Sequence, residues 1–567
     1  MAIIVWKALR VLLLCLSCYG YLYLIVDKGK IKVEFSPAIL FSAIGSAMFF
    51  AGILNILKET CFAIFIAGIA FAIYSFVKKY NPLRFICPGT VFFFICLVYL
   101  GYFYYGCKLR EYDDFTHWGL VVRSLLQTDR LPNFMDTIIY KSYPTGSAGF
   151  IYFVCKISGI SSEWMMLFAQ AVFVIGCFMC LFAFVKHKVT GFLMIFVFAV
   201  AVLGSYRFVL SGLYVDVLLP LVGLTGILIG IYYDTDINRV LWAILPETVF
   251  LIAVKNSGLF FVVVIIIYVL IRIKWKTVKK GWAAAFISAP FLTLLLWQKH
   301  VDLVFDKGLA SKHTMSVHGL KEAFLDKKPQ AISEIFDKYL SVVFDLRNIF
   351  LLFLILAIVA LVVVYLFQKQ QFGTFLRLVS IGAVSYLLYQ CSLLGMYLTS
   401  MPVDEAVRLA SYDRYHLTIM IFVMGILLAG ILQMQFSHKA ISVLMLGVAS
   451  AVNLFTFAPK LSYLQKQPLN TPARQNLEAL IEEHQIPKGS SFVLFSEDDF
   501  AYSGYVCGYL LNNYSMYLYT GDPTGKMPKD IRRYDYIIIA DPTEKNRTYV
   551  KDVLKIDDTR QVIRLKK

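Results

Sequence analysis

The sequence predicts a polytopic α-helical membrane protein that carries a small α/β domain at its C-terminal end. Of its 567 residues, 59% are hydrophobic and only 16% are charged, whereas a soluble domain normally has about 25% charged residues. Uncharged runs such as Val91–Tyr105, Leu259–Ile271 and Phe350–Leu366 approach the length that crosses a bilayer. Such runs end at residue 457, which predicts a membrane domain over 1–457 and a separate domain, here called the tail, over 458–567.

Hydropathy predicts about fourteen transmembrane helices. The first follows Lys7 and Arg10 as a signal peptide does, but it has no small-residue cleavage site and more spans follow, so we expect a retained helix. The predicted spans lie near residues 11–27, 36–57, 61–77, 86–106, 163–185, 189–205, 210–233, 240–256, 257–271, 282–298, 347–367, 375–398, 415–433 and 440–457.

The eleven cysteines carry little functional signal. Cys15 with Cys18 and Cys177 with Cys180 have CxxC spacing, but both pairs lie inside apolar runs. Small buried side chains explain them better than metal or redox chemistry does. The tail holds only Cys507, so it has no internal disulfide.

Lysine and arginine predict the orientation, because they concentrate in cytoplasmic loops. One set of alternate loops is rich in them, and the short turns of the other set contribute little beyond Lys7, Arg10, Lys58, Arg207 and Lys255. We therefore expect the first set to face the cytoplasm and the N-terminus to lie outside. The basic residues of that set are Lys28, Lys30, Lys32, Lys78, Lys79, Arg84, Lys186, Lys188, Arg239, Arg272, Lys274, Lys276, Lys279, Lys280, Lys369, Arg377 and Lys439.

With this orientation, all the large polar segments share the outer face: the loop 107–162, the loop 299–346, the loop 399–414 and the tail. The formal net charge of +17 then reflects topology. A nucleic-acid partner is not expected, because the basic residues lie at the cytoplasmic membrane edge and not on a soluble face.

The tail has the pattern of a small α/β domain. Thr471 and Pro472 supply an N-cap and an N1 proline for a helix over Ala473–His484. Strands are expected at Ser491–Ser496, Met516–Thr520, Tyr534–Ala540 and Gln561–Leu565, the third apolar enough to be central, with helices near Tyr502–Leu511 and Arg547–Leu554.

The first outer loop contains an acidic, aromatic segment, Glu111–Gly119 (EYDDFTHWG). Asp113 or Asp114 is a candidate general base, since neighbouring carboxylates raise each other's pKa. We favour Asp114, which stands next to Phe115 at the expected helix start, and His117 is placed to share the proton or to orient an aspartate. The alternative is that the two aspartates cap a helix beginning near Phe115.

Two further features of this loop suit a substrate that is half lipid. Trp118–Gln127 is amphipathic, with Leu120, Leu125 and Leu126 opposite Arg123, and such a helix can lie in the membrane interface. Pro144 and Gly146 then force a turn, which makes Tyr143 a candidate substrate-binding residue.

Ionisable residues near the membrane complete the candidates, because charges at membrane depth are costly and usually functional. Asp216 enters a span near its outer end, Lys255 stands between two spans and Arg207 precedes the Asp216 helix. The alternatives are a structural ion pair of Asp216 with Lys255 or Arg207, and a lysine that binds a lipid phosphate.

The loop 399–414 adds Arg408, Asp413 and Arg414, and a guanidinium fork suits phosphate oxygens. Interfacial anchoring explains these arginines equally well. Lys312, His313 and His318 lie in the loop 299–346. His313 is a candidate for substrate binding, but the histidine spacing requires no metal.

These features together resemble the GT-C glycosyltransferases: the acidic pair in the first large outer loop, the Tyr143-Pro144-Thr145-Gly146 turn, the intramembrane Asp216 and the Arg414-Tyr415 pair. Within them the chain is most similar to the branch that uses polyprenyl-phosphate sugars, which includes protein O-mannosyltransferases and lipid A aminoarabinose transferases. The resemblance covers mainly residues 85–300, with support near 400–415. Asp-Asp stands here where the mannosyltransferases commonly have Asp-Glu.

The resemblance implies inverting transfer of a sugar from a lipid-linked phosphate donor to a glycan, lipid or protein acceptor outside a bacterial plasma membrane. Asp113 or Asp114 would deprotonate the acceptor, while Lys255, Arg408, Arg414 or Arg207 would bind the phosphate. No cofactor is required by this chemistry, and a divalent metal remains possible. The alternatives are a polysaccharide polymerase or ligase, and a transporter or flippase of lipid-linked sugars that uses Asp216 and Lys255 as pathway charges.

Overall fold

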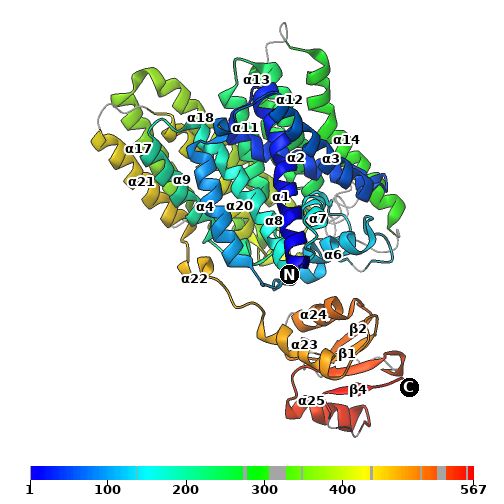
Figure 1. The fold of residues 1–567 in the computed structure, drawn as a ribbon. Coiled ribbons are helices and arrows are strands. Elements are labelled where there is room, and N and C mark those ends of the chain that lie inside the picture. The colour runs from blue at the N-terminus through cyan, green and yellow to red at the C-terminus, as the bar shows by residue number, and fades with distance from the viewer. Residues whose placement is uncertain are drawn as a thin grey trace.

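The computed structural model describes residues 2–136, 138–272, 278–305, 327–345, 349–434, 439–498, 501–519, 531–556, 558 and 560–566. A large helical bundle makes up most of the molecule, and the tail lies against one end of it (Figure 1). The helices of the bundle are α1 (Ala2–Tyr23), α2 (Ser36–Ile53), α3 (Leu57–Val77), α4 (Pro88–Tyr104), α5 (Tyr112–Thr116), α6 (Trp118–Thr128), α7 (Gly146–Ser158), α8 (Glu163–Phe178), α9 (Lys188–Leu203), α10 (Phe208–Ser211), α11 (Leu218–Tyr232), α12 (Ile237–Val254), α13 (Gly258–Arg272), α14 (Lys280–Val304), α16 (Pro329–Val343), α17 (Ile349–Phe367), α18 (Phe372–Thr399), α19 (Val403–Val407), α20 (Tyr412–Leu432) and α21 (Lys439–Phe457).

The bundle is that of a helical membrane protein. Among the described residues, nine helices are long and apolar enough to cross a membrane, and five shorter apolar helices have 10–17 residues. Each predicted span coincides with one of these fourteen helices, although a 15-residue helix such as α11 extends only about 23 Å. Because a hydrocarbon core is about 30 Å thick, the number of spans stays a prediction.

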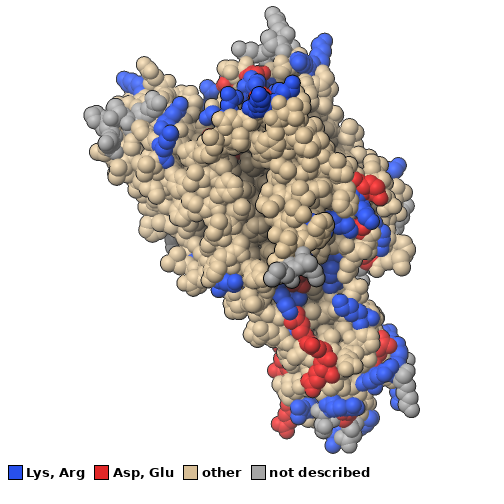
Figure 2. Space-filling model, in the orientation of Figure 1, with Lys and Arg blue, Asp and Glu red and all other residues tan. Residues whose placement is uncertain are grey.

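Burial separates the central helices from those at the perimeter. α8, α11 and α20 are buried along almost their whole length, whereas α1 and α3 expose apolar side chains such as Leu12 and Ile66. Figure 2 shows the corresponding surface, a broad uncharged band with lysine and arginine gathered at the end away from the tail. Such a band is the surface that a bilayer covers.

Contacts group the connecting loops at two ends of the bundle, as the charge pattern predicts. At one end, the amide of Lys32 donates to the hydroxyl of Tyr233 (2.8 Å), and Arg272 pairs with Asp234 (2.6 Å). These contacts join basic loops that the sequence assigns to the cytoplasmic side.

At the other end, the polar segments meet each other. Trp297 donates to the carbonyl of Ser142 (2.8 Å), Lys338 donates to the carbonyl of Val407 (3.0 Å), and Arg10 near the N-terminus donates to the carbonyl of Ile157 (2.7 Å). The described parts of the loops 107–162, 299–346 and 399–414 therefore lie together, at the end that carries the tail.

The loop 107–162 is more helical than expected. α7 is a buried helix within it, and α6 packs its apolar residues Leu120 and Leu125 in the protein interior. Leu120 and Leu125 therefore face protein and not lipid, and a location of α6 in the membrane interface stays a prediction. α6 packs against α7, most of whose residues are buried.

The tail has the predicted α/β fold. Thr471 caps α23 by accepting from the amide of Arg474, and Pro472 takes the first helical position. The strand order is β2-β1-β3-β4, in which β1 is parallel to β2 and β3, and β4 is antiparallel to β3. The elements are α23 (Pro472–Glu483), β1 (Phe492–Phe495), α24 (Tyr502–Leu511), β2 (Met516–Tyr519), β3 (Tyr536–Ile539), α25 (Glu544–Thr548) with a π-helical turn at Tyr549–Val553, and β4 (Val562–Arg564).

The two ends of the bundle give a test of orientation. We predict that Met135→Cys and Glu544→Cys, both exposed at the tail end, react with a membrane-impermeant thiol reagent in intact cells. Lys78→Cys, exposed at a basic loop, should react only after permeabilisation. If only Lys78→Cys were labelled in intact cells, the orientation would be the reverse of the one predicted.

Candidate functional site

A charged cavity of about 70 Å³ lies at the tail end of the bundle. Besides Glu405, its wall contains four charged residues from four segments that are far apart in the chain: Asp113, Asp216, Lys255 and Arg414. All four were selected from the sequence as candidate site residues. The remaining wall consists of Trp118, Tyr140, Tyr143, Tyr214, Met401, Glu405, Ser411 and Tyr415.

The four charges form one continuous chain of ion pairs. Arg414 Nη1 lies 3.4 Å from Asp113 Oδ2, and Arg414 Nε lies 3.6 Å from Asp216 Oδ2. The second oxygen of Asp216 lies 3.5 Å from Lys255 Nζ. Asp216 and Lys255 are only 3% and 8% exposed, so each depends on its partners for compensation of its charge.

Breaks in helical structure place these side chains. Asp216 lies in the turn between α10 and α11, and Lys255 lies where α12 ends and the chain turns back into α13. Gly258 fits this reversal because a Cβ there would lie 2.1 Å from the carbonyl oxygen of Leu251. Arg414 is in the first turn of α20, whose N-cap Ser411 has a left-handed φ of 62°. Non-glycine residues in that region carry local strain, which often accompanies functional sites.

The ion pairs of the cavity are longer than others in the same molecule. The Arg474–Glu163 pair and the Arg272–Asp234 pair are 2.7 and 2.6 Å long, near the usual 2.7–2.9 Å of a charge-assisted hydrogen bond. Distances of 3.4–3.6 Å leave Lys255 and Arg414 with N–H groups that are not fully used. The cavity cations are therefore able to accept a further anionic partner.

Aromatic rings surround the charges. Tyr140 and Tyr143 are stacked with centroids 5.1 Å apart and planes 12° apart. Lys255 Nζ lies 5.7 Å from the ring centres of both Tyr143 and Tyr415, where the ring faces attract a cation. The turn that carries Tyr143 comes this close to Lys255 because Gly146 has no side chain: a Cβ there would lie 2.7 Å from the carbonyl oxygen of Ala253.

The two neighbouring aspartates have different surroundings. Asp113 faces the cavity, and burial raises its pKa although Arg414 opposes the shift. Asp114 is fully buried away from the cavity, where its Oδ1 accepts from the amide of Leu213 (2.9 Å). Burial raises the pKa of Asp114 well above its usual range. The sequence-based preference for Asp114 is therefore not supported, and Asp113 is the better candidate base.

The alternative interpretation holds only in part, because both aspartates lie in the first turn of α5, where negative charge is favourable, but neither is its N-cap. α5 begins at Tyr112, and its N-cap residue Glu111 makes no side-chain capping bond. The carboxylates of Asp113 and Asp114 instead contact Arg414 and Leu213, which are distant in the sequence. Tertiary contacts decide their positions.

His117 does not line the cavity, but it packs against two of the tyrosines that do. Its ring lies edge-on to Tyr140 and Tyr143, with centroids 5.9 and 5.4 Å away. Burial lowers the pKa of His117 to about 3, which keeps the ring neutral at physiological pH. In the described part of the chain its Nδ1 has no hydrogen-bond partner.

Two other candidates, Arg207 and Arg408, do not line the cavity. Arg207 pairs with Glu111 (3.2 Å), and Arg408 is an exposed residue that pairs with Asp404 (3.9 Å). His313 lies outside the described residues, as do Lys312 and His318. Within the described ranges, no three His, Cys, Asp or Glu side chains are grouped closely enough to hold a metal ion.

Tyr214, Tyr415 and Glu405 also line the cavity, and none of them was a candidate site residue from the sequence, although Tyr415 belongs to the Arg414-Tyr415 pair. The first two were recognisable, because Tyr214 precedes Asp216 by two residues and Tyr415 follows Arg414. The Arg414 guanidinium lies 5.1 Å from the ring centre of Tyr214. Glu405 gave no signal, since exposed loop carboxylates are common.

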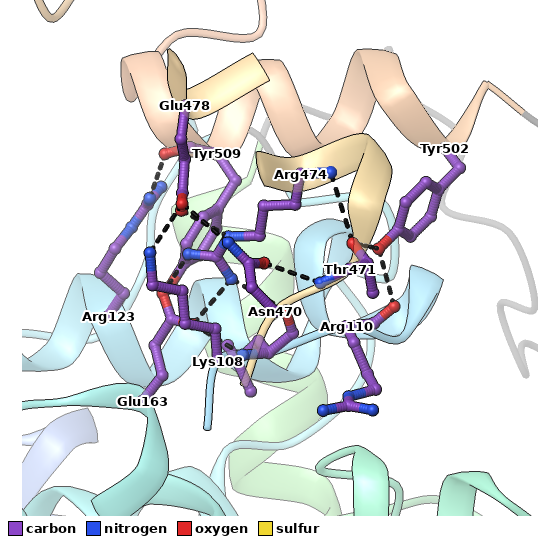
Figure 3. Close-up of polar contacts among 11 residues, drawn as sticks. Lys108, Arg110, Arg123, Glu163, Asn470, Thr471, Arg474, Glu478, Tyr502 and Tyr509 are labelled. Atoms are coloured by element: carbon purple, nitrogen blue, oxygen red, sulfur yellow. Dashed lines mark hydrogen bonds and ion pairs between the residues drawn. The ribbon is translucent and has the colours of Figure 1, made fainter. Parts of the chain in front are cut away.

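The tail braces the loop that carries Asp113 (Figure 3). Arg474 of α23 binds both carboxylate oxygens of Glu163 (2.7 and 2.8 Å) and donates to the carbonyl of Leu109 (2.8 Å). Lys108 pairs with Glu478 (2.7 Å), and the hydroxyl of Tyr502 donates to the carbonyl of Arg110 (2.9 Å).

Aromatic packing extends this brace to α5. Phe115 lies edge-on to Tyr502 and Tyr509, with centroids 5.8 and 5.2 Å away, and Tyr112 packs in the same way on Tyr505 (5.2 Å). The hydroxyl of Tyr514 donates to the carbonyl of Phe115 (2.8 Å). The tail therefore contacts the acidic segment through side chains other than Asp113, which pairs with Arg414.

No protein-family model matches the chain, and no curated protein is similar enough to it to identify a relative.

We predict that Arg474→Ala loosens the tail and the acidic loop together. Removing one partner from a nearly buried ion-pair network costs about 3 kcal/mol, because the carboxylates of Glu163 and Glu478 lose their compensation. Hydrogen–deuterium exchange should accelerate over residues 108–116. Arg560→Ala, which removes an exposed pair with Asp558, is the matched control and should leave that exchange unchanged. Equal exchange in the two variants would contradict the bracing role.

Proposed function

We propose that this protein is a membrane-embedded glycosyltransferase that moves a sugar from a polyprenyl-phosphate donor to an acceptor on the extracytoplasmic side of a bacterial plasma membrane. The observation that carries the proposal is the convergence of Asp113, Asp216, Lys255 and Arg414 on one cavity. A candidate base, two cations with spare donors and a set of aromatic rings are the groups that such a transfer requires.

In the proposed reaction, Lys255 and Arg414 bind the donor phosphate. The acceptor hydroxyl attacks the anomeric carbon of the sugar while Asp113 takes its proton. The bond from the anomeric carbon to the phosphate oxygen breaks, and the lipid leaves as a phosphate monoester. The attack comes from the face opposite the leaving oxygen, so the anomeric configuration inverts.

The negative charge that Asp113 loses in this step appears on the departing phosphate, and Arg414 can pair with either group. The donor phosphodiester carries one negative charge and the departing monoester carries two, while Asp113 loses its negative charge on accepting the proton. As Asp113 becomes neutral, Arg414 is released from its 3.4 Å pair and is free to bind the phosphate more closely. The raised pKa of Asp113 favours this transfer of the proton.

Asp216 acts as a positioning residue in this scheme. Its two oxygens lie between Lys255 (3.5 Å) and Arg414 (3.6 Å), which keeps the cations side by side without neutralising either at close range. The stacked rings of Tyr140 and Tyr143 offer a flat apolar face to the sugar.

A flippase of lipid-linked sugars is the second candidate, and Glu247 favours it. This residue lies in α12, is fully buried, and neither of its carboxylate oxygens has a hydrogen-bond partner among the described residues. Isolated carboxyl groups inside membrane spans are typical of proton-coupled transport. A fluorescent polyprenyl-phosphate lipid in proteoliposomes would be translocated by a flippase without any transfer of sugar.

We predict that Lys255→Gln and Arg414→Gln each raise the donor KM about 10- to 100-fold, as expected for the loss of a hydrogen bond to a charged group. Initial rates with radiolabelled polyprenyl-phosphate sugars in proteoliposomes measure this effect. Arg408→Gln is the control, because that exposed guanidinium lies outside the cavity. Normal donor use by both cavity variants would contradict the phosphate site.

The aspartates give a sharper comparison. Asp113→Asn should lower turnover by about 10²–10⁴, the usual contribution of general base catalysis. Asp114→Asn should lower it less than about tenfold, since asparagine still accepts from Leu213 and resembles the protonated acid that burial favours.

The pH profile provides a second readout for Asp113. Activity requires the deprotonated form, so turnover falls as the pH drops through the pKa of Asp113. Because burial raises that pKa, the acid limb should lie above about pH 3.9, the ordinary aspartate value.

A larger loss of turnover in Asp114→Asn than in Asp113→Asn would show that Asp114, and not Asp113, is the base.

A further inference from the structure

A second and larger cavity, here called the junction cavity, lies where the tail meets the bundle. Its volume is about 520 Å³, within the roughly 300–1,000 Å³ of small-molecule sites. The wall comes from the loop after α4, from α6, from the start of α8 and from the tail. Its lining includes Lys108, Arg123, Gln127, Ser162, Trp164 and Lys488.

The lining has an excess of positive charge. Lys108 and Arg474 are compensated by Glu478 and Glu163. Arg123 donates to the carbonyl of Tyr509 and to the side-chain oxygen of Asn512, and neither group is charged.

Lys488 is exposed, and in the described part of the molecule it has no carboxylate partner. Arg123 and Lys488 therefore give the cavity two positive charges that the neighbouring acids do not balance. An anionic ligand would supply the missing charge.

The wall also offers uncharged polar groups and an aromatic face. Ser162 Oγ is buried from solvent and has no hydrogen-bond partner among the described residues, although the residue occupies the N-cap position of α8. Gln127 and Ser161 are exposed in the same wall, beside the half-buried ring of Trp164. Hydroxyl, amide and ring groups together are suited to a polyhydroxylated ligand.

α6 connects the two cavities. Trp118 at its first turn lines the charged cavity, whereas Arg123 and Gln127 further along line the junction cavity. A separation of five to nine helical residues corresponds to about 8–14 Å. A chain-like ligand in the junction cavity is thus within reach of Asp113.

We propose that the junction cavity binds an anionic saccharide, which is the acceptor of the transfer. This inference rests on the proposed glycosyltransferase function and adds the chemical class of its acceptor. A saccharide is favoured over a lipid headgroup because the tail, which lies beyond the apolar band of the bundle, forms one wall. Carboxylate or phosphate groups of the saccharide meet Arg123 and Lys488, and its hydroxyls meet Ser162 and Gln127.

The test measures binding to the full-length protein in nanodiscs of zwitterionic lipid, without donor. The probe is a fluorescently labelled hexamer of galacturonic acid, and the neutral comparison is labelled maltohexaose. The acidic hexamer should bind more tightly, and its affinity should fall as salt is raised. Equal binding of the two hexamers would overturn the proposal.

Two variants locate the binding. Lys488→Glu should weaken the acidic hexamer by about fivefold or more, since it replaces an attraction with a repulsion. Lys545→Glu makes the same change on exposed α25 outside the cavity lining, and should not alter binding. Ser162→Ala should weaken binding about 2- to 10-fold at unchanged stability, because its hydroxyl makes no internal bond.

Two further outcomes separate the alternatives. Displacement of the hexamer by phosphatidylglycerol in the nanodisc, with the same sensitivity to Lys488→Glu, would assign the cavity to a lipid headgroup and overturn the proposal. Arg414→Gln should raise the donor KM about 10- to 100-fold in the transfer assay and leave hexamer binding intact. Hexamer binding that depends on Lys488, without any sugar transfer, would contradict the proposed glycosyltransferase function but support the saccharide site. Sugar transfer without such binding would support the glycosyltransferase function and overturn the saccharide site.

Discussion

The candidate site depends on the two ion pairs that the guanidinium of Arg414 forms. This guanidinium lies between the carboxylates of Asp113 and Asp216, and so joins the outer loop to the centre of the bundle. Asp216 in turn forms an ion pair with Lys255, which lies at the break between α12 and α13. Because these groups are withdrawn from water, none is stable there without the others. A site built from four distant segments thereby becomes one cooperative unit.

A second arginine, in the tail, holds the same loop. Arg474 of the tail binds Glu163 and the carbonyl of Leu109, only four residues before Asp113. The loop between Leu109 and Asp113 is therefore clamped by one arginine from the tail and one from the bundle. This arrangement gives the tail a structural role in the site, whether or not it also binds an acceptor. It also explains why the tail packs through ion pairs and tyrosines, which form a specific and well-ordered interface.

The sequence predicted much of this architecture, because the strongest signals were local. Long apolar runs predicted the membrane helices, and the N-cap at Thr471 predicted the start of α23. The residue types that ionise near a membrane were few enough to nominate Asp216, Lys255 and Arg414 in advance. What the sequence did not predict depends on tertiary contact. Asp113 and Asp114 are neighbours in the chain, and only the fold turns one towards Arg414 and the other towards the amide of Leu213. In the same way, the apolar side chains of α6 pack in the protein interior, although the amphipathic pattern of α6 also suits a membrane surface.

In the proposed function, Lys255 and Arg414 together receive the phosphate of a lipid-linked substrate. The most direct measurement is a structure by electron cryomicroscopy of the full-length protein in nanodiscs containing a polyprenyl phosphate. The account predicts phosphate density within about 4 Å of both Lys255 Nζ and the Arg414 guanidinium, the limit of an ion pair. Density for the phosphate at another place, with the Asp113–Arg414–Asp216–Lys255 chain undisturbed at saturating lipid, would contradict it.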